Sequence, residues 1–172
     1  MLWLWLWQMF GLKVWGCNSV EWSELIGRYL AIGRTKLRKS LVELRVQILR
    51  SAWGMDIGSG ARVSLSARLD KTNPSGVHIG IDTGIGPEAV ILTHDFVASK
   101  HTDTWIGRNC HIGAKVIVTA GVRIGDSCIV APGSVVMRDV PSGSLVAGNP
   151  ARVIEKGLEL GPWGIRNWDG IR

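Results

Sequence analysis

The sequence predicts an all-β solenoid of hexapeptide repeats, preceded by an N-terminal amphipathic helical segment. From Ile57 onward aliphatic residues recur every six positions, whereas between residues 20 and 52 they recur every three, four or seven. Many of the 22 glycines directly follow the recurring aliphatic residue. A period of six matches neither a helix nor a strand, but it matches a triangular coil whose sides are short strands and whose corners are turns.

Residues 1–19 form a Trp/Leu-rich leader that begins MLWLWLWQMF. Its alternation suits a strand, and its amphipathic Trp side chains equally suit a water–lipid or a protein–protein boundary, so its structure stays open. The leader lacks the basic region and small-residue cleavage site of a signal peptide. Gln8 and Lys13 interrupt it before the roughly 18 apolar residues that a membrane span needs, so we expect no spanning segment.

Residues 20–53 are predicted to form a basic amphipathic helix, with Ser19 as a candidate N-cap. Gly27 and Gly33 each weaken it by about 1 kcal/mol relative to Ala, which leaves a break into two shorter helices open. The helix is expected to present one apolar stripe, either to the solenoid, to other copies of the chain or to a membrane. That stripe consists of Ile26, Leu30, Leu37, Leu41, Leu44 and Ile48.

The basic residues of this helix account for the whole formal net charge of +6. Residues 28–50 hold seven Lys and Arg against Glu43 alone, and seven minus one is six. The rest of the chain balances at thirteen basic and thirteen acidic residues, so no nucleic-acid partner is expected. A peripheral contact of the N-terminal segment with the inner membrane face is one hypothesis for the basic stripe.

The clearest repeats start at Ile106, and three hexapeptides make one coil of eighteen residues. This arithmetic stacks Ile106 under Ile124, with a spacing of about 4.8 Å between strands. Weaker copies run through Ile57, Val63 and Leu69 and through Ile79, Ile85 and Ile91. The strongest column positions are Ile106, Ile112, Val118, Ile124, Val130 and Val136, each followed four places later by Cys110, Val116, Val122, Cys128, Ser134 or Val140.

The period breaks twice, which predicts two loops that leave the solenoid. One insertion lies near residues 71–76, and a longer one spans residues 94–104 and contains His94 and His101. Loops that a rigid scaffold expels are the usual place for functional residues. The three dispersed cysteines indicate no disulfide framework and suit a reducing, cytoplasmic setting.

Residues 56–156, and above all the motifs IVAPGSVVMRDVP and AGNPARVI, resemble the hexapeptide-repeat acyltransferases. This family includes maltose, galactoside and xenobiotic O-acetyltransferases, and the resemblance leaves open an exopolysaccharide or lipopolysaccharide acetyltransferase. It implies a left-handed parallel β-helix, a homotrimer, and acetyl-CoA in the groove between adjacent solenoids. Residues 1–53 and the C-terminal tail, residues 157–172, lie outside the resemblance.

The resemblance places the family's catalytic histidine at His94, in ILTHDF. A histidine suits this role because its unperturbed pKa near 6.5 lets it take the proton of a hydroxyl at neutral pH. Transfer would then be direct, without an acyl-enzyme. His101 is the alternative base or lines the acceptor pocket, Asp95 is a candidate to orient His94, and Asp70 matches a family acceptor aspartate.

Five further residues match positions that contact coenzyme A in the family: Arg108, Pro132, Met137, Arg138 and Arg152. Basic side chains suit this role because they attract the phosphates of the cofactor. Pro132 replaces the usual Ala, and Met137–Arg138 replaces the common Thr–Lys. The resemblance therefore predicts an acetyl-CoA-dependent O-acetyltransferase that acts on a sugar or a polysaccharide precursor.

Two alternatives use the same solenoid. A non-catalytic scaffold would bind no acetyl-CoA. The γ-class carbonic anhydrases bind zinc with three histidines, two of them separated by four residues, but six residues separate His94 from His101 and nine separate His101 from His111. No metal is therefore expected. Serine acetyltransferases carry a GGTG-type loop that this sequence lacks.

Overall fold

The computed structural model describes residues 19–166, with side chains from residue 28 onward, so the predicted leader falls almost wholly outside the described residues. The chain divides into two compact units, Met1–Lys39 and Ser40–Arg172, which are described separately. Helix α2 (Ser19–Ser51) has no break at Gly27 or Gly33. Within the described residues, no helix is long and apolar enough to cross a membrane.

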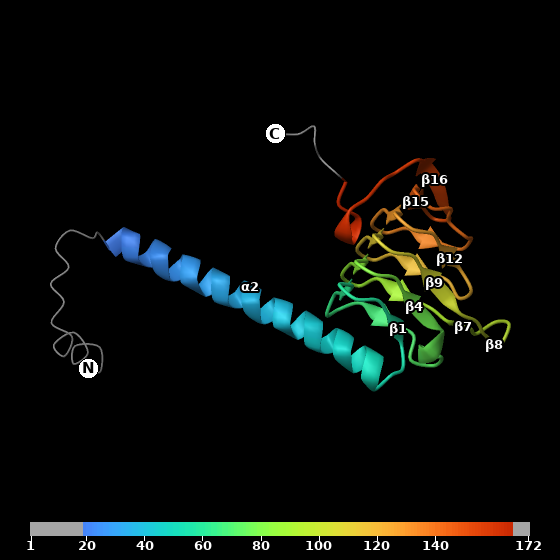
Figure 1. Cartoon of the computed structure of the whole chain (residues 1–172), viewed down its shortest axis with the longest axis horizontal. Coiled ribbons are helices and arrows are strands. Elements are labelled where there is room, and N and C mark those ends of the chain that lie inside the picture. The colour runs from blue at the N-terminus through green and yellow to red at the C-terminus, as the bar shows by residue number, and fades with distance from the viewer. Residues whose placement is uncertain (1–18, 167–172) are drawn as a thin grey trace. The chain divides into compact units, whose positions relative to one another are not determined.

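The chain between Asp56 and Val136 winds through three parallel sheets in turn (Figure 1). Sheet A contains β1-β4-β9-β12, sheet B contains β2-β5-β10-β13-β15-β16, and sheet C contains β3-β6-β11-β14. Each set of three successive strands therefore closes one coil. The strands are β1 (Asp56–Ile57), β2 (Arg62–Val63), β3 (Arg68–Leu69), β4 (Val77–Ile79), β5 (Gly84–Ile85), β6 (Val90–Ile91), β9 (Thr104–Ile106), β10 (His111–Ile112), β11 (Ile117–Val118), β12 (Arg123–Ile124), β13 (Ile129–Val130) and β14 (Val135–Val136).

The strand pairing confirms the eighteen-residue coil predicted from the repeats. Ile106 pairs with Ile124, and Ile112 pairs with Val130, in parallel register. Within most strands the first residue faces outward and the second is buried, because successive side chains of a strand point to opposite faces. The interior is consequently a set of stacked aliphatic columns, in which Cys110 and Cys128 are also fully buried.

The glycines that follow the inward aliphatic residues are needed for close packing of successive coils. A Cβ on Gly80 would lie 2.5 Å from the backbone nitrogen of Arg108, and one on Gly107 would lie 2.6 Å from the carbonyl carbon of Gly125. Neither distance is possible between non-bonded atoms. Positive φ occurs instead two positions later, for example at Asn109 (φ 54°), where the corner turns.

The last turns of α2 cover the open end of the first coil. Val46 and Leu49 are buried, and two arginines donate hydrogen bonds to carbonyl groups of the first coil. Arg45 bonds to the carbonyl oxygens of Leu65 and Ala67, and Arg50 bonds to those of Ile57 (2.7 Å) and Gly58 (2.5 Å). These arginines satisfy polar groups that the first coil could otherwise offer to another strand.

The face of α2 that packs is not the apolar stripe predicted from the sequence. Leu41, Leu44 and Ile48, all members of that stripe, are 42%, 52% and 47% exposed. Periodicity identified the longest apolar row of the helix. The side that packs against the end of the solenoid is instead the one that carries Val46 and Leu49 together with Arg45 and Arg50. The members of the stripe from Leu30 to Ile48 are therefore exposed.

The C-terminal segment returns along sheet B. After β15 (Leu145–Gly148) and the antiparallel β16 (Ala151–Glu155), Leu158 donates a hydrogen bond to the carbonyl oxygen of Gly143. Trp163, in the short helix η2 (Pro162–Gly164), stacks 3.5 Å from the guanidinium of Arg62 and donates its indole N–H to the Gly60 oxygen. The predicted tail, residues 157–172, is thus packed against sheet B as far as it is described.

Candidate active site

Both predicted insertions leave the coils at the same corner, between sheet C and sheet A. We call this corner the hairpin edge; it consists of residues 70–76, 92–103, 119–121 and 137–139. The longer insertion contains β7 (His94–Asp95) and β8 (Lys100–His101), an antiparallel hairpin that projects from the stacked coils (Figure 1). The hairpin edge therefore brings the two histidine candidates to the same side of the molecule.

His94 and His101 face each other across the hairpin. They are paired in register, and their ring centroids lie 5.0 Å apart with an interplanar angle of 82°. His94 is half-buried and His101 is exposed. The ring of Phe96 lies 6.0 Å from that of His94 in an edge-on arrangement. Two imidazoles are thus available to one bound molecule, with His94 the more enclosed.

The tip of the hairpin is apolar and open to solvent. Phe96 is 87% exposed and Val97 is 97% exposed. Asp95, predicted as a candidate to orient His94, accepts hydrogen bonds from the backbone N–H groups of Val97 (2.9 Å) and Ala98 (3.0 Å) through one carboxylate oxygen. Its described contacts therefore form the turn of the hairpin.

The base of the hairpin is held by the shorter insertion. Asp70 accepts a hydrogen bond from the N–H of Thr93 (3.0 Å) through one carboxylate oxygen and from the N–H of Thr72 (2.8 Å) through the other. The buried Thr93 hydroxyl donates to the carbonyl oxygen of Asn73 (2.7 Å). Since Thr93 directly precedes His94, this network fixes the backbone from which the His94 side chain extends.

A second buried threonine closes the hairpin on the other side. The Thr104 hydroxyl donates to the carbonyl oxygen of Leu92 (2.6 Å) and accepts from the N–H of Gly121 (3.0 Å). The backbone of Thr102 also bonds to that of Thr93. Periodicity did not identify Thr93, Asn73 or Thr104 as supporting residues, and the only signal for them was their position next to the phase breaks.

The pKa of the Asp70 carboxyl lies below its usual value. Burial alone would raise this pKa, but backbone N–H groups of Thr93, Thr72 and His94 and the side chain of Thr72 stabilise the charged form and outweigh burial. A carboxyl with a lowered pKa in the folded state stabilises the fold at pH values above its unfolded pKa. That contribution is lost as the pH falls through the folded-state pKa.

We expect Asp70→Asn to lower the free energy of unfolding at neutral pH by roughly 1 kcal/mol, because Asp70 is partly solvated and Asn still accepts one hydrogen bond. The difference from the wild type should begin to shrink below about pH 4, where the carboxyl of the unfolded chain takes up a proton, and should disappear below the lowered folded-state pKa. Urea unfolding of both proteins across this pH range measures it. A difference that is constant with pH would contradict the role of the Asp70 charge.

The five residues expected to contact coenzyme A lie on different parts of the coil surface. Met137 (58% exposed) and Arg138 lie on the hairpin edge, two coils beyond His94. Arg108 lies at the corner between sheets A and B, Pro132 at the corner between sheets B and C, and the exposed Arg152 on β16. One copy of the chain therefore does not bring all five together.

Of the three candidate arginines, Arg108, Arg138 and Arg152, only one already forms an ion pair with a carboxylate of the described residues. Arg108 bonds to Asp126, with its Nε atom 3.1 Å from a carboxylate oxygen. Arg152 bonds to the carbonyl oxygen of its neighbour Ala151, and neither Arg138 nor Arg152 forms an ion pair within the part of the chain described. Arg138 and Arg152 are thus the better placed of the three to receive an anionic group.

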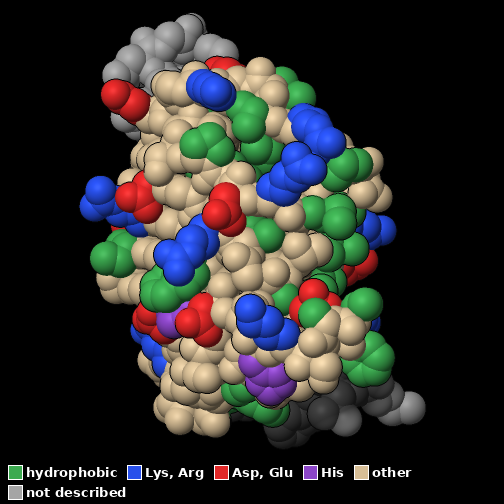
Figure 2. Space-filling model, turned by 90° about the vertical axis from the view of Figure 1, so that its right-hand side faces the viewer, with side chains coloured by type: hydrophobic (Ala, Val, Ile, Leu, Met, Phe, Trp, Pro, Cys, Tyr) green, Lys and Arg blue, Asp and Glu red, His purple; other side chains and the backbone are tan. Residues whose placement is uncertain are grey.

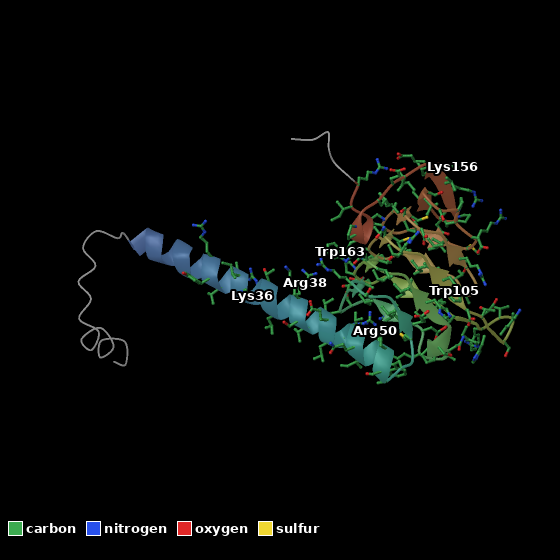
Figure 3. The ribbon with its side chains drawn as sticks, viewed as in Figure 1. Lys36, Arg38, Arg50, Trp105, Lys156 and Trp163 are labelled. Atoms are coloured by element: carbon green, nitrogen blue, oxygen red, sulfur yellow. The ribbon has the colours of Figure 1, made fainter. Side chains whose placement is uncertain are left out.

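Sheet A carries an outward aromatic ladder that sequence reasoning did not identify. The ring of Trp105 stacks on that of His78 at 3.6 Å and 4°, and His78 Nδ1 lies 3.0 Å from a carboxylate oxygen of Asp56. Arg123 lies over the other side of Trp105. Trp105, 38% exposed, and Trp163 mark different sides of the coils in Figure 3. His78 and Trp105 each directly precede an inward isoleucine, but the insertion between them hides this shared position from a count of eighteen residues.

Figure 2 shows one side of the molecule, where histidine side chains reach the surface among basic, acidic and apolar groups. Within residues 19–166, no group of three or more His, Cys, Asp and Glu side chains is arranged to hold a metal ion.

Comparison with known proteins identifies the repeats. Residues 103–138 match the family model described as bacterial transferase hexapeptide (six repeats). The chain is 33% identical to YvoF of Bacillus subtilis, a provisionally named acetyltransferase, over 109 residues that make up 62% of this chain and 63% of YvoF. It is 35% identical to serine acetyltransferase 4 of Arabidopsis thaliana over 127 residues, which make up 69% of this chain and 35% of the relative. The chain thus spans less than two thirds of both relatives.

Solved structures of hexapeptide-repeat acetyltransferases are also similar to this chain. A maltose O-acetyltransferase from Clostridium difficile 630 superimposes with a TM-score of 0.54 at 26% identity, covering 76% of this chain and 89% of that chain. A hexapeptide-repeat acetyltransferase from Vibrio cholerae, crystallised with acetyl coenzyme A, superimposes with a TM-score of 0.53 at 28% identity, covering 72% and 84%. Residues 103–138 thus carry hexapeptide-transferase repeats, and most of the chain is similar to hexapeptide-repeat acetyltransferases.

Proposed function

We propose that this protein is an acetyl-CoA-dependent O-acetyltransferase in which His94 acts as general base toward a hydroxyl of a sugar or polysaccharide precursor. The observation that carries the proposal is the position of His94: half-buried, on a hairpin held at its base, on the same edge as Met137 and Arg138. The relatives named as acetyltransferases support the reaction class, and the maltose O-acetyltransferase supports a sugar acceptor.

His94 has the chemistry and placement that the reaction needs. When bound, acetyl-CoA supplies a thioester whose acetyl carbon is attacked by the acceptor oxygen while the carbon–sulfur bond breaks. The imidazole of His94 accepts the proton of the attacking hydroxyl and returns it to the leaving sulfur, so that no covalent bond to the protein forms. His101, opposite His94, lines the acceptor side of the same hairpin.

The cofactor residues support an active form of at least two adjacent copies, for which we propose a homotrimer of left-handed solenoids. Because Arg108, Pro132 and Arg138 lie on three different corners, a groove lined by all of them requires two adjacent copies. Arg138 and Arg152 would hold phosphate groups, and the exposed Met137 would contact the pantetheine arm. In this arrangement His94 of one copy faces cofactor bound against its neighbour.

The test is a screen of acceptors with acetyl-CoA in which released thiol is measured. The panel contains maltose, galactosides, polysaccharide precursors and serine. We expect thiol release that depends on a sugar acceptor. Thiol release with serine alone would favour the acceptor of the serine acetyltransferases, to which the chain is also related in sequence. Failure to bind acetyl-CoA at all would support a non-catalytic scaffold.

A further inference from the structure

The N-terminal unit presents a strongly basic surface. Residues 28–39 of α2, RYLAIGRTKLRK, which we call the 28–39 surface, carry five basic side chains and no acidic one. None of the five forms an ion pair within the part of the chain described. Lys36 and Arg38 are labelled on α2 in Figure 3. The five residues are Arg28, Arg34, Lys36, Arg38 and Lys39.

The same twelve residues expose large apolar side chains. Tyr29 is 75% exposed, Leu30 68%, Ile32 54% and Leu37 62%. Isolated exposed apolar residues are common, but four within nine residues of one helix are a local concentration of exposed apolar side chains. Burying these side chains against an apolar partner would therefore be favourable.

Helical geometry separates the two kinds of side chain. At about 100° per residue, the four apolar residues fall within an arc of about 160°, and Arg28, Arg34, Arg38 and Lys39 occupy the remaining side. Lys36 lies within the apolar arc, where its long alkyl stem can lie along an apolar surface while its ammonium group stays in contact with water. Residues 28–39 are therefore basic on one side and apolar on the other.

We infer that the 28–39 surface binds the surface of a lipid bilayer that contains anionic lipids. The apolar arc enters the boundary between head groups and acyl chains, and the basic residues contact lipid phosphates. The leader that precedes α2 contains Trp3, Trp5, Trp7 and Trp15 in its sequence, and tryptophan is enriched at water–lipid interfaces. This inference does not depend on the proposed enzymatic activity.

Two other partners fit the surface less well. A second copy of the same surface would bring five positive charges against five more, and no acidic residue within residues 28–39 offsets the repulsion. A nucleic acid would satisfy the basic side chains through its phosphates but would leave Tyr29, Leu30, Ile32 and Leu37 exposed. An anionic bilayer satisfies both sides of the helix.

The test is flotation of the full-length chain with phosphatidylcholine vesicles, with and without phosphatidylglycerol, at low and high salt. We expect binding only to vesicles with phosphatidylglycerol, and less of it at high salt. Arg34→Gln with Arg38→Gln should lower the partition coefficient about 30-fold at low salt, since each basic residue near such a surface is worth about 1 kcal/mol. Leu30→Gln with Leu37→Gln should lower it about tenfold or more.

Gln is almost as good a helix former as Leu or Arg, so both variants keep the helix, which circular dichroism checks. The matched controls are Arg68→Gln with Lys156→Gln and Ile81→Gln with Ile165→Gln, exposed residues of the other unit that should leave binding unchanged. Equal binding to both vesicle types, or unchanged binding of both α2 variants, overturns the inference. So does a fall in the solution mass of the leucine variant without vesicles, which would make this surface an interface between copies.

Discussion

Replacing His94 by Ala is expected to lower the rate of acetyl transfer by about 10²- to 10⁴-fold, the usual contribution of a general base. The loss should lie in kcat, because His94 acts on the proton of the bound hydroxyl and its removal leaves the candidate phosphate-binding arginines intact. Initial rates at saturating acetyl-CoA, measured over a range of acceptor concentrations, give kcat and KM separately.

His101→Ala is the matched control, because His101 is paired with His94 on the same hairpin but is more exposed. We expect it to change kcat by less than about tenfold and to act mainly on the KM of the acceptor. The reverse order, with His101→Ala nearly inactive and His94→Ala nearly normal, would assign the base to His101. Equal and small effects of both would remove the hairpin histidines from the chemistry.

Replacing Ile112 by Ala is expected to lower the free energy of unfolding by about 2–5 kcal/mol. Ile112 is fully buried in the coil interior, between Ile85 and Val130 in the same column. The columns are closely stacked, and the glycine contacts between coils leave little room for the backbone to collapse into the cavity. Denaturant unfolding at one fixed protein concentration measures the change, since association of copies would make stability depend on concentration.

Ile117→Ala provides the comparison within the same coil. Ile117 precedes the buried Val118 on β11 and is 37% exposed, so its truncation should cost about 1 kcal/mol or less. The ratio of the two effects tests the alternation of outward and inward residues on which the coil depends. Similar losses for both variants would mean that the outer face of sheet C is buried against another surface.

The coil could be predicted from the sequence because its determinants are local and repeated. Every six residues an inward aliphatic residue is followed by a tight corner. Three such hexapeptides make one coil, so the eighteen-residue register between strands can be counted from the sequence. The phase breaks located the loop and the hairpin for the same reason. No such repetition exists in α2, where the packed side was decided by carbonyl groups of the first coil that Arg45 and Arg50 bind.

The candidate site was predictable only in part. His94 could be located because it directly follows a coil and matches a family motif, but its support could not, since the Asp70–Thr93 contact joins residues 23 positions apart through loop backbone. The aromatic stack of His78 and Trp105 likewise depends on an insertion that shifts their spacing to 27 residues, so an eighteen-residue count does not pair them.

The most direct test of the central claim is the structure of the product formed from acetyl-CoA and an acceptor identified by the screen. We predict that mass spectrometry will show one added acetyl group, that NMR will locate it on a hydroxyl oxygen as an ester, and that His94→Ala will form almost none. An acetyl group on nitrogen, or the same yield of ester from His94→Ala as from the wild type, would contradict the account.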